Sequence, residues 1–218
     1  MKNMFKLVKL SCYNLISIKN SIILMIVCFS IASIFNPVFS VMLMGMMTYT
    51  IGYQTMAYED SYGVDYLISY LPVTKKEYVI SRYLFSLLSI IISALIFSIM
   101  YFISMKLNLL DYRVVNYKVN MLMGIASSMG LVSLYIPVML KYGIKKSRLA
   151  MTIIFMLLIM VPTFLLMSIE ESEVVKNIIY KISQLDGNIA YIVALLMMLI
   201  LSYIVSLKIY CNKEIKNA

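Results

Sequence analysis

Five long stretches without any charged residue constrain this 218-residue chain more than any other feature. They cover residues 20–58, 83–105, 119–140, 149–169 and 187–207. A charged side chain at the centre of a bilayer costs about 2.5–3.5 kcal/mol on insertion scales, and about 20 residues of helix cross the hydrocarbon core. Each of the last four stretches therefore predicts one membrane-spanning helix.

The first stretch is nearly twice as long as the others, and Asn36-Pro37 divides it near its middle. It predicts a tight helical hairpin, which raises the expected number of spans to six. Hydrophobic residues make up 62% of the chain and charged residues 13%, whereas soluble domains have roughly half and a quarter. We therefore expect an all-α polytopic membrane protein, because a large soluble core seldom contains five such stretches.

Lysine and arginine are distributed unequally between the connections. The N-terminus, the second and fourth connections and the C-terminal tail carry 14 of them, against 5 in the third and fifth connections. Because cytoplasmic loops are enriched in these residues, both termini are expected in the cytoplasm of a protein that crosses the cell membrane several times. Acidic residues divide evenly, so the net charge of +9 falls on the cytoplasmic face. There it favours the lipid bilayer and its anionic headgroups over nucleic acid.

Two segments outside the spans also have helical periodicity. Residues 1–19 predict an amphipathic helix on the membrane surface. Its apolar face holds Met4, Leu7, Val8, Leu15 and Ile18. Residues 170–188 predict a second amphipathic helix, in the outer interface before the last span.

The second connection, residues 59–82, contains a capped helix start. Thr74 and Glu77 have the spacing of a capping box, in which each side chain accepts a hydrogen bond from a backbone N–H of the other residue. Val73 and Tyr78 occupy the two positions of a hydrophobic staple. A helix is therefore expected to begin here and to continue into the third span.

The residues before this start predict a short helix of their own. Pro72 disfavours helical geometry at the preceding residue, so a segment over residues 65–71 is expected to end there. Asp65 has the residue type of an N-cap. Tyrosine recurs at every fourth position from Tyr58 to Tyr70, which suits either an anchor among lipid headgroups or a contact with a partner protein.

Between Leu71 and Tyr78, Pro, Thr, two Lys, Glu and Tyr follow an acidic, aromatic segment. This order resembles the cytoplasmic loop between the second and third spans of small ABC-2-type transporter permeases, such as exporters of peptide toxins (phenol-soluble modulins) and bacteriocin-immunity permeases. The resemblance covers about residues 59–88 and the layout of the chain. It implies an N-terminal connecting helix, a cytoplasmic coupling helix, and an extracellular or re-entrant helix before the sixth span.

The resemblance also implies partners. A separate ABC ATPase subunit is expected to bind ATP and Mg²⁺, and a second permease copy or paralogue is expected to complete a dimer. The residues expected to contact the ATPase and carry its movement into the third span are Glu59, Asp65, Tyr66, Tyr70, Pro72, Thr74, Lys75, Lys76, Glu77 and Tyr78.

Uncharged polar side chains within the spans are candidates for the substrate path. They are Asn36, Tyr49, Tyr53, Gln54, Ser93 and Ser127. Short outer connections leave no room for a receptor domain, so we expect a hydrophobic or amphipathic substrate that enters from the membrane. A peptide toxin or an antimicrobial peptide fits this description.

Missing motifs argue against other function classes. The sequence has no Gly-Lys pair and therefore no phosphate loop, so the chain is not expected to be an enzyme that hydrolyses ATP. With no histidine and three scattered cysteines, no metal site is expected. A proton-coupled carrier would need charged residues inside the spans. Two alternatives remain: the vitamin-binding membrane subunit of an ATP-driven importer, and a membrane scaffold that transports nothing.

Overall fold

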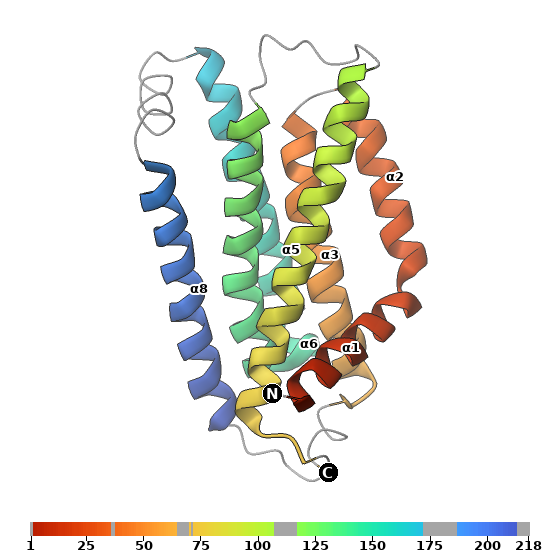
Figure 1. Ribbon diagram of the computed structural model, residues 1–218, viewed down its shortest axis with the longest axis vertical. Helices are drawn as coiled ribbons and strands as arrows, with labels where there is room; N and C mark the ends of the chain where they lie inside the picture. The colour runs from red at the N-terminus through yellow and green to blue at the C-terminus, as the bar shows by residue number, and fades with distance from the viewer. Residues whose placement is uncertain are drawn as a thin grey trace.

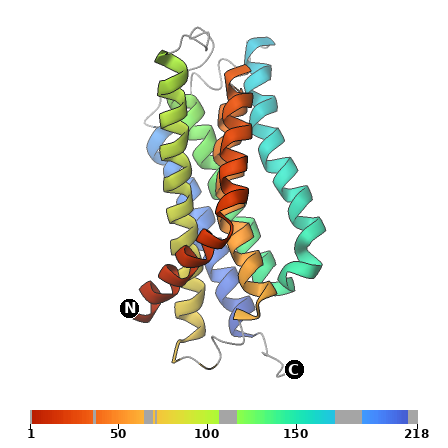
Figure 2. The ribbon, with the colours of Figure 1, turned by 90° about the vertical axis from the view of Figure 1, so that its right-hand side faces the viewer.

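The computed structural model describes residues 2–35, 38–64, 70, 72–106, 117–171 and 187–212. These residues form α1 (Lys2–Ser17), α2 (Lys19–Phe35), α3 (Val38–Ser61), α5 (Lys75–Lys106), α6 (Tyr117–Glu171) and α8 (Gly187–Cys211). The long helices lie side by side in one bundle, and α1 lies across its lower part (Figures 1 and 2). No strand occurs in the described ranges, so the prediction of an all-helical protein is confirmed there.

The helix α6 is interrupted at Gly143, where the backbone leaves helical geometry (φ 66°, ψ −178°). Figure 2 shows that the chain reverses its direction there, so residues 117–142 and 144–171 form two antiparallel arms. A positive φ of this size is readily adopted by glycine, which has no Cβ. The sequence predicted a loop over residues 141–148; the structure has a single non-helical residue in its place.

The start of α1 and the end of α8 lie at the same end of the bundle (Figures 1 and 2). The connection from α3 to α5 and the break at Gly143 lie at this end too. We call it the terminal end. It gathers the segments that the lysine and arginine counts assigned to one side of the membrane, while the assignment of that side to the cytoplasm stays a prediction.

By length and composition, three stretches of the described residues are long and apolar enough to cross a membrane: Lys75–Ile103, Asn120–Leu157 and Val193–Cys211. The second of them includes the reversal at Gly143 and is therefore divided between the two arms of α6. A fourth crossing results if the pair Met4–Ser17 and Lys19–Cys28, bent by 68°, counts as one span. The protein is therefore a multi-pass membrane protein, while the count of six spans stays a prediction. The predicted hairpin turn, most of the coupling helix and most of the outer helix lie outside the described residues.

The helices bury polar side chains and expose apolar ones, the arrangement expected when lipid is the solvent. In α5, Ser89 and Ser93 are buried, whereas Ile91 and Leu95 are more than half exposed. The exposed aliphatic side chains can remain in contact with lipid tails, and the buried hydroxyls hydrogen-bond inside the bundle.

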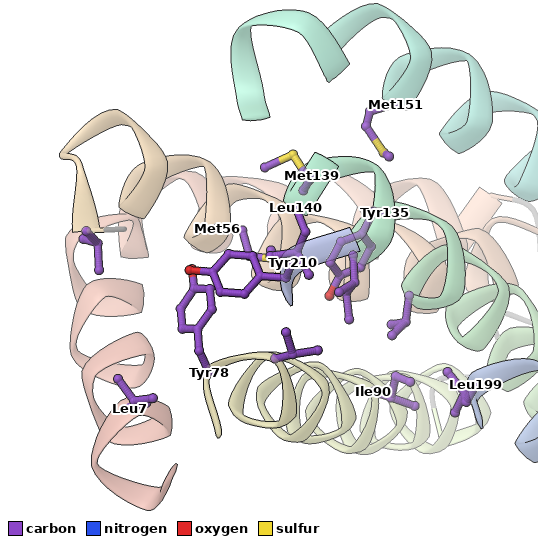
Figure 3. Packing of buried hydrophobic residues seen from close by; sticks show 14 of the residues in the cluster. Leu7, Met56, Tyr78, Ile90, Tyr135, Met139, Leu140, Met151, Leu199 and Tyr210 are labelled. Atoms are coloured by element: carbon purple, nitrogen blue, oxygen red, sulfur yellow. The ribbon is translucent and has the colours of Figure 1, made fainter. Parts of the chain in front are cut away.

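A compact hydrophobic core lies near the terminal end. Figure 3 shows Tyr135 and Leu140 of α6 close to Met56 of α3 and Tyr210 of α8, with Tyr78 of α5 beside Tyr210. All five side chains are buried. On α1, Leu7 and Val8 are buried as well, whereas Phe5 and Ile16 are more than half exposed. Part of the predicted apolar face of α1 therefore packs against protein, and the location of this helix on the membrane surface stays a prediction.

Candidate functional site

The connection from α3 to α5 ends in a formed capping box. The backbone N–H of Thr74 donates to Oε2 of Glu77 at 3.1 Å, and the backbone N–H of Glu77 donates to Oγ1 of Thr74 at 3.2 Å. The helix α5 begins at the next residue, Lys75. The hydrogen bond from the Thr74 backbone holds the pKa of Glu77 below its usual value, although partial desolvation opposes this. The predicted capping box is confirmed.

One turn further along α5, two buried side chains form a stacked unit. The guanidinium of Arg82 donates to the hydroxyl of Tyr78 at 2.9 Å and lies 4.5 Å from the centroid of that ring. The ring of Tyr78 lies 4.9 Å from the ring of Tyr210 at the end of α8 (Figure 3). The start of α5 is therefore joined to the end of α8 by aromatic packing.

The same arginine forms a buried ion pair with Glu59 of α3. The two side chains are only 4% and 2% exposed. Oε1 of Glu59 also accepts hydrogen bonds from Ser11 at 2.9 Å and Asn14 at 3.1 Å, both on α1, and Arg82 donates to the Ser11 hydroxyl at 3.0 Å. We call Ser11, Asn14, Glu59, Tyr78 and Arg82 the charged cluster. It joins α1, α3 and α5.

A second link at the terminal end joins α3 to the break in α6. Oδ2 of Asp60 accepts a hydrogen bond of 2.8 Å from the backbone N–H of Ile144, the first residue after Gly143. A Cβ at position 143 would lie 3.3 Å from that oxygen. Glycine at position 143 thus permits both the reversal of the chain and the close approach of the Asp60 carboxylate. This carboxylate, which belongs to α3, caps the N-terminal end of the second arm of α6.

Comparison with known protein families assigns the chain to one of them. Residues 6–211 match the family model described as ABC-2 family transporter protein. The chain belongs to this family. ABC-2 proteins are membrane components of ABC transporters and normally work with an ABC ATPase. No curated protein and no solved structure matches the chain.

Two of the residues expected to contact the ATPase, Glu59 and Tyr78, lie in the interior of this ABC-2 protein. Glu59 pairs with Arg82 of the same chain, and Tyr78 lies beneath that arginine. Neither side chain is accessible for a partner, since both are at most 4% exposed. The physical reason is that a carboxylate and a guanidinium at the edges of apolar helices satisfy each other when the helices pack.

Other expected contacts of the ABC-2 protein lie on the surface. Tyr70 is 86% exposed, and Pro72, Thr74, Lys75 and Lys76 are exposed too. Lys75 also donates to the backbone carbonyl of Cys211 at 3.1 Å, which ties the start of α5 to the end of α8. Asp65 and Tyr66 lie outside the described residues.

The role of Arg82 was missed in the sequence, where this residue counted only as one of the positive charges that set orientation. Ser11 and Asn14 were missed as well. One signal was available. Glu59 is the first charged residue after the first apolar stretch, and Arg82 is the last one before the second. Opposite charges at the facing ends of two consecutive apolar segments can meet when those segments form antiparallel helices.

The residues proposed for the substrate path divide into two groups. Ser93 and Ser127 are buried and donate to the backbone carbonyls of Ser89 and Gly124. The hydroxyl of Ser93 also lies 3.1 Å from that of Thr48, which is 3.2 Å from the hydroxyl of Ser128. These hydroxyls hold α3, α5 and α6 together.

Tyr49, Tyr53 and Gln54 are only partly buried. The rings of Tyr49 and Tyr53 are stacked, with centroids 4.7 Å apart and planes 8° from parallel, and Tyr49 also lies 4.2 Å from the ring of Phe155. Oε1 of Gln54 is buried and has no hydrogen-bond partner among the described residues. Asn36 lies outside them.

Proposed function

We propose that this ABC-2 protein is the permease subunit of an exporter and that a separate ABC ATPase moves it through the connection at residues 59–82. The contacts made just beyond the capped start of α5 support this proposal. An exposed corner at residues 72–76 leads, within about two helical turns, to Tyr78 and Arg82, which contact α1, α3 and α8. A displacement of the corner is therefore shared at once by three other helices.

In this proposal the transporter contains two permeases, identical or paralogous, and two ATPases that bind ATP and Mg²⁺. Each permease has six spans, with both termini in the cytoplasm. Closure of the ATPases pushes on the corner. The buried ion pair of Glu59 and Arg82 then passes the movement to α3 and α1, because two groups that are each other's counter-ion move together.

The proposed substrate is a hydrophobic or amphipathic peptide, such as a peptide toxin or an antimicrobial peptide. The stacked rings of Tyr49 and Tyr53 offer a partly exposed aromatic face. Apolar side chains of a peptide can pack on such a face. Gln54 lies next to these rings in the sequence, but its Oε1 is buried and is therefore less suited to substrate contact. Ser93 and Ser127 are less suited to substrate contact, since their hydroxyls already have partners within the bundle.

Disulfide trapping tests the proposed ATPase contact. Cys12, Cys28 and Cys211 are free and exposed, so they are first replaced by serine. Tyr70→Cys and Lys76→Cys are expected to cross-link to cysteines on the candidate ATPase, whereas Lys106→Cys, exposed at the opposite end of the bundle, is not. ATP-independent uphill transport by the purified chain would contradict the proposal.

A further inference from the structure

A cavity of about 440 Å³ opens at the terminal end, between the end of the first arm of α6 and the last turns of α8. It is lined by Lys141, Val205, Lys208, Ile209 and Asn212. None of these residues belongs to the charged cluster or to the exposed corner at residues 72–76. The cavity therefore needs an explanation of its own.

The polar part of the lining is cationic. It holds two lysine ammonium groups and one amide, and no carboxylate. Lys141 lies 4.9 Å from the ring centroid of its neighbour Tyr142. Among the described residues, no carboxylate forms an ion pair with Lys141 or Lys208. Two cations that line the same cavity attract an anion.

The remaining wall is apolar and continues onto the lipid-facing side of α8. Val205, in the lining, is 50% exposed, and one turn earlier Leu201 is 61% exposed. Lys208 lies one turn after Val205, at the end of the helix. An anionic group bound by the lysines can therefore remain joined to a hydrocarbon chain that lies along α8.

We propose that this cavity binds the phosphate headgroup of an anionic phospholipid, with an acyl chain along Leu201 and Val205. The charge of the lining and its continuity with the lipid-facing surface favour a lipid over a soluble anion. Basic pockets between spans are suited to anionic headgroups, and the volume lies within the range of small-ligand sites. The bound lipid joins the end of α8 to the turn of α6.

The test uses the purified full chain in detergent. Native mass spectrometry measures the binding of phosphatidylglycerol and phosphatidylcholine, and thermal unfolding followed by circular dichroism gives an independent measure. Wild type is expected to bind phosphatidylglycerol about 25-fold more tightly than phosphatidylcholine, because each of the two lysines contributes about a factor of five near an anionic headgroup.

Two double variants with the same change of charge separate a site from a diffuse attraction. K141Q/K208Q is expected to lose the preference for phosphatidylglycerol. K145Q/K146Q, which neutralises two exposed lysines beside the same turn but outside the lining, is expected to keep it. Equal losses in both variants would overturn the proposal, and so would the absence of any preference in wild type.

Two further outcomes would assign the lysines to another ligand. If inorganic phosphate competes with phosphatidylglycerol at similar concentrations, the site is one for free phosphate. If K141Q/K208Q keeps its lipid preference but loses co-purification with the ATPase, the lysines contact that partner. Either result would overturn the lipid assignment.

Discussion

Two buried polar regions of this ABC-2 protein are held together by different kinds of interaction. The charged cluster at the terminal end uses full opposite charges, Glu59 and Arg82, contributed by two different helices. The second region, in the middle of the bundle, is a network of hydroxyls, with Thr48 of α3 between Ser93 of α5 and Ser128 of α6. Apart from Asn14, which is half-buried, the side chains of both regions are buried.

The two regions differ in what remains when one member is lost. The buried serines of α5 donate to backbone carbonyls of their own helix: the hydroxyl of Ser89 donates to the carbonyl of Ser86, and that of Ser93 to the carbonyl of Ser89. A hydroxyl that loses its neighbour on another helix therefore keeps one hydrogen bond. The carboxylate of Glu59 instead binds side chains of α1 and α5. The charged cluster is thus expected to be far more sensitive to single substitutions than the hydroxyl network.

The largest expected effect is that of Arg82→Met. It leaves the buried Glu59 carboxylate without its counter-ion, and removing one partner of a buried pair typically destabilises by about 3–5 kcal/mol. Thermal unfolding of the purified protein is expected to show this loss.

The double variant E59M/R82M serves as the control, because it removes both charges at once. It is expected to recover most of the stability but not the coupling of ATP hydrolysis to transport. If E59M/R82M is as unstable as Arg82→Met, the loss arises from packing and not from an uncompensated charge.

A smaller effect is expected for Gly52→Ala, on α3 between the two regions. A Cβ there would overlap the hydroxyl oxygen of Tyr135 and would lie 2.9 Å from its ring, and a buried ring cannot easily move. Overpacking of this kind costs about 1–3 kcal/mol, which thermal unfolding can detect.

Gly124→Ala is the matched control for this variant. Its nearest clash is with the sulfur of Met44 at 2.7 Å, and a methionine side chain can rearrange. Gly52→Ala is therefore expected to be clearly less stable than Gly124→Ala. Equal stabilities would show that the ring of Tyr135 shifts without difficulty.

Substitutions in the corner at residues 72–76 are expected to affect function more than stability. Thr74→Ala removes an N-cap, which is worth about 0.5–2 kcal/mol. It is expected to leave basal ATP hydrolysis of the reconstituted complex intact while lowering its stimulation by substrate.

Glu77→Gln should preserve the stimulation, since glutamine can replace glutamate in a capping box, whereas Glu77→Ala should not. Full stimulation in a triple Pro72→Ala, Thr74→Ala, Glu77→Ala variant would show that the corner has no role in coupling.

The smallest effect is expected for Thr48→Val. It removes the hydroxyl between Ser93 and Ser128, and side-chain hydrogen bonds between membrane helices average about 0.6 kcal/mol. A loss comparable to that of Arg82→Met would erase the distinction between the two regions. Thermal unfolding of both variants in one detergent makes this comparison directly.

Local patterns made part of this molecule predictable from its sequence. The charge-free stretches reflect the cost of burying charge in lipid, and the all-helical fold agrees with them. The capping box of Thr74 and Glu77 depends on a spacing of three residues within one turn, and the structure confirms it. Such features need no knowledge of how distant segments pack.

Long-range pairs were not predictable in the same way. Asp60 caps Ile144 across 84 positions of the chain, and Ser11 meets Glu59 across 48. Which polar side chain meets which depends on how the helices are rotated about their axes, and that depends on the packing of the whole core. For this reason Glu59 and Tyr78 were assigned to a surface although they are buried.

Because the chain reverses at the single residue Gly143, insertions are expected to be tolerated differently there and in the connection from α3 to α5. Asp60 of α3 can reach Ile144 only because nothing is inserted between the arms of α6. Extra residues at that point would separate the carboxylate from its donor and free the second arm from α3. The connection after α3, whose Tyr70 projects into solvent, is under no comparable constraint at that position. Variation in length and sequence among related permeases is therefore expected to concentrate in this connection, which is the segment proposed above to contact the ATPase.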